Sequence, residues 1–166
     1  KFANGARTAG FQYLFNQASQ ALAENRVSVT TTVDEATGAH SYRIRGFLCN
    51  ASAECNATLA DGAYDYVNQN DIPFTDDDLR VGRHDLFGGN PIRHTQNIST
   101  RTSVNITLEG HIFDPGDVTH QVHFENGALF YDVTGTGTGN FPSFNNGAGV
   151  FLFRPGGQNV VNQFGR

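Results

Sequence analysis

The chain has 166 residues, enough for one domain, or for one domain with a short leader, and for a core that needs no cross-links. Its formal net charge of −5 argues against a surface that grips nucleic acid non-specifically, because such affinity comes from neutralising phosphates; a nuclease with a small basic cleft is still compatible. No apolar run approaches the length of a transmembrane helix, so we expect no membrane span. The absence of any Met suggests a fragment of a longer polypeptide.

The N-terminal part of the chain predicts a helix followed by a β-hairpin. Residues 1–24 place Phe11, Leu14, Phe15, Ala18 and Leu22 on one helical stripe. Residues 27–33 are rich in β-branched side chains and residues 41–48 alternate in part. The turn signal at residues 34–38 lies between them, which predicts a hairpin.

A second helix is expected over residues 52–68, with Ser52 as its N-cap. Residues 75–78 can start only a short turn, and the Gly-, Asn- and Pro-rich residues 82–92 are expected to be irregular.

The second half of the chain predicts antiparallel β-structure. In residues 103–108 apolar and polar side chains alternate, so we expect the face of Val104, Ile106 and Leu108 to be buried. Asn126-Gly127 is a strong hairpin signal, and a two-residue loop there places Tyr131 diagonal to His120 across the hairpin.

The Thr-Gly repeat of residues 134–139 looks too flexible for the interior of a strand, and residues 149–153 are expected to form the last strand. Together these elements predict an α+β fold with N-terminal helices followed by a small antiparallel β-sheet domain. We place a boundary between a helical and mixed leader region, residues 1–80, and a β-rich core, residues 81–166. One compact domain overall is the alternative.

Cys49 and Cys55 are the only cysteines. They can be two partly buried free thiols or a local disulfide, and the sequence leaves both open.

Histidine is the most promising chemical group, because its ordinary pKa lets it both take and give a proton near neutral pH. Five of the six His residues lie between positions 84 and 123. We expect His40, His84 and His123 to be solvated or structural. The candidate catalytic residues are His94, His111, His120, Tyr131 and Thr138.

A phosphate group could be held by the same region of the chain, because glycines let backbone amides approach an anion. The candidate substrate-binding residues are Arg93, Arg101, Thr134 and Thr136. A zinc site built from the three candidate His with Asp114 or Asp117 is the competing reading, but no tight metal-binding spacing is present. We therefore favour metal-free acid–base chemistry with no cofactor.

Lys1-Phe-Ala-Asn-Gly-Ala-Arg-Thr-Ala-Gly-Phe-Gln-Tyr-Leu-Phe-Asn16 resembles the segment that precedes a variable toxin near the end of rearrangement-hotspot (Rhs) and filamentous-haemagglutinin proteins. The segment from Cys49 and Cys55 to Ile72-Pro-Phe74 resembles a cysteine-bearing module of such C-terminal regions. The resemblance implies a toxin domain of a larger parent polypeptide, secreted by or displayed on the producing bacterium. It also implies action in a target cell and a cognate immunity protein.

Three functions follow as hypotheses. The first is a metal-independent RNase toxin that uses His acid–base catalysis, with RNA as its substrate. The second is a toxin enzyme that acts on the cell envelope or on a nucleotide such as NAD. The third is a non-enzymatic, β-rich binding or adhesion module, which the Asn-, Thr- and Gly-rich composition and the acidic charge favour.

Overall fold

The computed structural model describes residues 27–70, 81–86, 88–113 and 115–166, and contains strands and helices in the order β1β2α2β3β4β5β6β7α3. The strands are β1 (Val27–Asp34), β2 (Ala39–Asn50), β3 (Gly82–Leu86), β4 (Asn90–Asn97), β5 (Thr102–Thr107), β6 (Gly116–Glu125) and β7 (Ala128–Thr138). The helices are α2 (Ala57–Asn70), the short 3-10 turn η2 (Ile98–Thr100) and α3 (Pro142–Phe164). The predicted helix over residues 1–24 and the turn over residues 75–78 lie outside the described residues.

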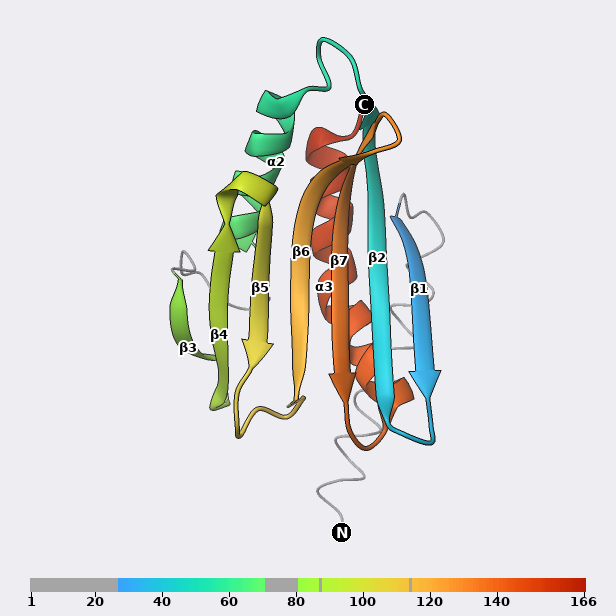
Figure 1. Cartoon of the computed structure of the whole chain (residues 1–166), viewed down its shortest axis with the longest axis vertical. Coiled ribbons are helices and arrows are strands. Elements are labelled where there is room, and N and C mark those ends of the chain that lie inside the picture. Colours follow the sequence, from blue (N-terminus) through green and yellow to red (C-terminus); the bar gives the residue numbers. More distant parts are fainter. Residues whose placement is uncertain (1–26, 71–80, 87, 114) are drawn as a thin grey trace.

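The strands form one seven-stranded antiparallel sheet in the order β1-β2-β7-β6-β5-β4-β3. Both helices lie on the same face of it, which we call the inner face, with α3 running behind β7 and β2 (Figure 1). The α+β class and the antiparallel sheet are as predicted, but the order of helices before a small sheet was wrong: β1 and β2 precede α2, and the long helix α3 follows β7. Because β2 pairs with β7, the sheet runs across the boundary placed at residue 80.

The long helix is at the C-terminal end of the described chain, so the prediction of a last strand over residues 149–153 was wrong. Glycines and an internal Pro155 weaken the local helical signal. The helix forms because it packs on the sheet, where Gly149 and Gly157 let its backbone approach the side chains of Tyr42 and Ile44. Pro142, at the start of the helix, lacks only an N–H that would have no helical partner there.

Two segments expected to be irregular are strands. Residues 82–92 enter a β3–β4 hairpin that turns through Gly88 and Gly89, both with positive φ. The Thr-Gly repeat continues β7 to Thr138, because Gly135 and Gly137 leave room for large side chains of β2. The hairpins expected around residues 34–38 and at Asn126-Gly127 are observed, the latter in the predicted register with His120 opposite Val133.

Strand β5 faces the opposite way from the prediction. Ser103 and Asn105 are buried on the inner face, whereas Ile106 is 40% exposed on the outer face. The alternation was therefore assigned to the wrong side, and the reason is that the inner face here is a polar wall rather than a purely apolar core.

Cys49 and Cys55 form a disulfide that joins the end of β2 to the segment before α2. Both cysteines are buried, in the core shared by the sheet and the two helices.

Candidate functional site

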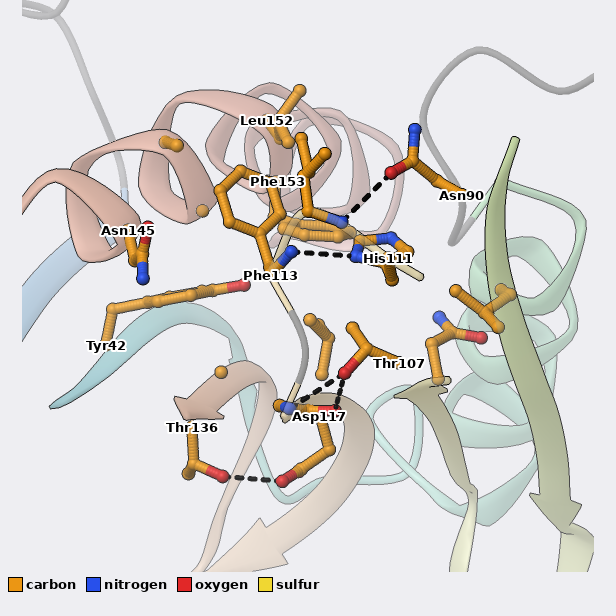
Figure 2. Close-up of a pocket in the computed structure, with 18 of the residues that line it drawn as sticks. Tyr42, Asn90, Thr107, His111, Phe113, Asp117, Thr136, Asn145, Leu152 and Phe153 are labelled. Carbon is orange, nitrogen blue, oxygen red and sulfur yellow. Dashed lines mark hydrogen bonds between the residues drawn. The ribbon is translucent and has the colours of Figure 1, made fainter. Parts of the chain in front are cut away.

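A cavity of about 360 Å³ lies between the inner face of the sheet and α3, below the loop that joins β5 to β6 (Figure 2). Most of its wall is apolar, from Leu86, Ile92, Ile112, Phe113, Val118, Ala148, Leu152 and Phe153. The polar residues that line it are His40, Tyr42, Asn90, Asn105, Thr107, His111 and Asn145, together with Asp117 and Thr136, whose side chains the strand register places on the outer face beside Ile106.

The Tyr42 ring forms one wall and is held between two glycine backbones. A Cβ added at Gly135 of β7 or at Gly149 of α3 would lie 2.1 Å from Cε1 of Tyr42, so neither position can carry a side chain without displacing the ring. Phe153 stacks on the same ring, with 6.4 Å between centroids. The two glycines thus keep sheet and helix close at the cavity.

The Tyr42 hydroxyl is buried and has no hydrogen-bond partner among the described residues. Burial, together with the nearby negative charge of Asp117, raises the pKa of Tyr42. The phenol therefore keeps its proton at any physiological pH and can donate it in a hydrogen bond. Asp117 is itself held by Thr136, whose hydroxyl donates to Asp117 Oδ1 over 2.5 Å.

A hydrogen-bonded chain of three polar side chains, two of them buried, leads to the opposite wall. The Gln96 amide nitrogen lies 2.9 Å from His94 Nε2, and His94 Nδ1 lies 2.7 Å from Asn105 Oδ1. An amide nitrogen can only donate, so Nε2 accepts and the neutral imidazole carries its proton on Nδ1. That proton is donated to Asn105 Oδ1. The Asn105 Nδ2 group is left buried and without a partner in the described part of the chain.

His120 is buried on the inner face of β6, where its Nδ1 lies 2.7 Å from the Tyr131 hydroxyl. This is the partner that the hairpin register suggested. Burial, and to a smaller degree the nearby His94, lowers the pKa of His120 to about 3. The imidazole is therefore neutral at physiological pH and packs edge-on against Phe153 of the cavity wall.

His111 lies in the loop between β5 and β6 and lines the cavity (Figure 2). The Phe113 N–H donates to His111 Nδ1 over 3.1 Å, so the neutral ring carries its proton on Nε2. The same loop is tied to β4 by a hydrogen bond from the Ile112 N–H to Asn90 Oδ1.

The other predicted site residues are dispersed. Arg93 is exposed on the outer side of β4, and Arg101 pairs with Asp61 of α2 over 2.6 Å. Thr134 points away from the inner face and Thr138 is exposed at the end of β7. Neither arginine lines the cavity, and of all the predicted site residues only His111 and Thr136 do. The structure thus does not gather the predicted phosphate-binding set, because Thr134, Thr136 and Thr138 alternate with the inner-face residues of β7 and so share its outer face, away from both arginines.

Sequence reasoning missed Tyr42, Asn105 and the α3 residues as site residues. The signal for Asn105 was present, since Ser103, Asn105 and Thr107 alternate along one strand. This polar strand face, close in sequence to His94 and His120, could have identified Asn105 as a site residue.

On the outer face, Asp132 is the centre of an ion-paired cluster. Arg43 and His123 donate to its Oδ2 over 2.5 and 2.8 Å, and Arg45 donates to Oδ1 over 3.1 Å. Arg45 also pairs with Glu125. Burial opposes the ionisation of Asp132, but these hydrogen bonds and charges lower its pKa overall. The charged groups here satisfy one another, which is typical of a cluster that holds strands together.

Among the described residues, no three His, Cys, Asp or Glu side chains converge as a metal site would require. Asp114, one of the suggested ligands, lies outside the described residues. No helix in the described part of the chain is long and apolar enough to cross a membrane.

No protein-family model and no curated protein matches this chain. Solved structures do. CalU16 from Micromonospora echinospora is 13% identical with a TM-score of 0.43, over 82% of this chain and 91% of its own. The Aha1 dimer from Colwellia psychrerythraea is 15% identical with a TM-score of 0.44, over 72% and 93%. Human STARD10 is 11% identical with a TM-score of 0.33, over 92% and 78%. These values describe a partial likeness in chain path, so the site is interpreted from its own residues.

Proposed function

We propose that this domain binds a small, largely apolar molecule in the cavity between the inner face of the sheet and α3. The observation that carries the proposal is the cavity itself. Its volume of about 360 Å³ falls in the range of small-molecule sites, which are mostly apolar with a few placed polar groups.

The wall chemistry supports binding more than hydrolysis of a phosphodiester. Among the described residues that line the cavity there is no Arg or Lys, so a phosphate would meet no permanent positive charge. His120 is neutral, and His94 is fully buried and committed to Asn105 and Gln96. An apolar ligand would instead pack closely against Phe113, Leu152 and Phe153, whose side chains gain dispersion contacts when the cavity is filled.

The test is a titration with fluorene, a rigid apolar probe, followed by calorimetry or ligand fluorescence. We expect saturable binding with one site per chain. Ala148 is buried in the α3 wall, and Ala148→Leu extends a side chain into the cavity, so binding should fall at least tenfold. Asn159→Leu, an exposed position of the same helix, is the matched control and should bind as the parent chain does. Non-saturable binding, or equal binding by both variants, would remove the proposal.

A second proposal keeps the toxin hypothesis, with RNA as the substrate and an immunity protein as the partner. One observation favours it, namely that His111 and His40 line a single cavity, which supplies proton-transferring groups. The Cys49–Cys55 disulfide supports export, because disulfides persist in oxidising compartments.

Expression in the bacterial cytoplasm, with growth measured, tests this second proposal. A toxin should arrest growth and His111→Ala should relieve the arrest. Incubation of the purified domain with total RNA, with and without EDTA, then separates a metal-free RNase from a metal-dependent one. Normal growth together with intact RNA would remove the RNase hypothesis.

A further inference from the structure

We infer that the ligand of this cavity carries a neutral hydrogen-bond acceptor, of the kind a ketone or amide carbonyl supplies, and that Asn105 is the residue that recognises it. This inference rests on the proposed binding function and specifies the chemical class of the ligand.

The orientation of the Asn105 amide carries the argument. Gln96 can only donate to His94 Nε2, which leaves the His94 proton on Nδ1 and makes Asn105 Oδ1 its acceptor, over 2.7 Å. The amide is thereby fixed with its NH₂ on the other side. Asn105 is only 6% exposed and forms part of the cavity wall, and Nδ2 is its one polar atom without a partner in the described structure. A buried donor in this state favours a ligand that brings an acceptor.

A second donor lies in the opposite wall. Tyr42 is also 6% exposed, its hydroxyl has no partner among the residues that the structure describes, and its raised pKa keeps the proton on the oxygen. Each of these buried donors lies in an otherwise apolar cavity, and either one favours a ligand with an oxygen acceptor on an apolar skeleton.

The charge of the cavity selects against an anionic acceptor. The Asp117 carboxylate lies close enough to affect the Tyr42 phenol, and no Arg or Lys is found among the described lining residues. A ligand carboxylate would be repelled by Asp117 and would lose its hydration without a counter-charge, whereas a carbonyl loses little.

The test compares fluorenone, fluorene and fluorene-9-carboxylate, which share one three-ring skeleton. We expect fluorenone to bind roughly tenfold more tightly than fluorene, since one well-made hydrogen bond is worth about that factor, and the carboxylate to bind most weakly. If fluorene binds and fluorenone binds no better, the binding function stands and this inference fails. If none of the three binds, the binding function itself fails.

Variants assign the effect to Asn105. Asn105→Leu removes both amide donors at similar volume and should abolish the preference for fluorenone while fluorene still binds. Asn145→Leu is the matched control: this residue also lines the cavity, but its Nδ2 is bonded to the Asn140 carbonyl, so the preference should persist.

Asn105→Asp provides a variant that keeps the shape of the side chain in case Asn105→Leu folds poorly. It replaces the donor with an acceptor, so the preference should reverse towards 9-hydroxyfluorene over fluorenone. A fluorenone preference that survives both Asn105 variants, or a tighter binding of the carboxylate to the parent chain, would overturn the inference.

Discussion

Replacing Gly149 with Ala probes how closely α3 approaches the sheet at the cavity. In a helix interior Gly→Ala normally stabilises by about 1 kcal/mol. Here the new Cβ would lie 2.1 Å from Cε1 of Tyr42, far inside van der Waals contact. The ring cannot retreat, because a Cβ at Gly135 on its other side would meet it at the same distance. Overpacking of a buried site costs about 3 kcal/mol at the upper end, so we expect a net loss of about 2 kcal/mol.

Gly156→Ala is the matched control in the same helix, because a Cβ there meets nothing within 4 Å. It should stabilise by up to about 1 kcal/mol, which puts the two variants about 3 kcal/mol apart. For a domain of this size, that difference in stability corresponds to about 6–12 °C between the Tm values of the two variants. Urea unfolding should rank the parent chain and the two variants in the same order of stability. In a Tyr42→Leu background, which lacks the ring, Gly149→Ala should no longer destabilise. Equal stabilisation by both glycine variants would refute the close approach of α3 to Tyr42.

Three further predictions concern groups beside the cavity or on other parts of the sheet. Because the pKa of His120 is about 3 in the folded chain and near 6.5 unfolded, the unfolded chain binds an extra proton between these values. Stability should thus fall by about 2–3 kcal/mol from pH 6.5 to 4.5, and His120→Gln, which cannot take up that proton, should flatten the urea-midpoint profile; an unchanged slope would contradict this. Asp132→Asn removes the buried charge that three donors share and should cost about 3 kcal/mol, whereas Asp85→Asn, at an exposed pair, should change stability by under about 0.5 kcal/mol. Similar effects of the two would refute the role of Asp132. Replacing Cys49 and Cys55 together by Ser should lower stability by about 2 kcal/mol, as a short closed loop predicts, and the reducing agent that affects the parent chain should leave this variant unchanged.

The sequence predicted the parts of the fold that depend on local signals. Alternation and turn residues located the β1–β2 and β6–β7 hairpins, and the Asn126-Gly127 turn fixed a register that placed His120 beside Tyr131. These features depend on residues that are close together in the sequence, so a single sequence is enough to predict them.

Helix α3 and the β7 extension could not be found in this way. Gly149 disfavours a helix and Gly135 disfavours a strand when each is considered alone. Both are required by one long-range contact, in which the Tyr42 ring is held between them. The residues around either glycine in the sequence give no signal of this contact.

The predicted site residues lie at different distances from the cavity. His111 lies at the cavity and His94 lies one hydrogen bond behind its wall, but Arg93 and Arg101 point elsewhere. Strand parity explains the position of Arg93, because Arg93 and its neighbour His94 face opposite sides of β4. Arg101 instead lies in the turn after η2, where it pairs with Asp61.

The proposed apolar ligand occupies the space between the inner face of the sheet and α3. Intermolecular NOEs between fluorene and the methyl groups of the protein test this most directly. We expect NOEs to Ile92, Val118 and Leu152, which line the cavity, and none to Val104 or Ile106 on the outer face. NOEs to the outer-face methyls alone would contradict the account.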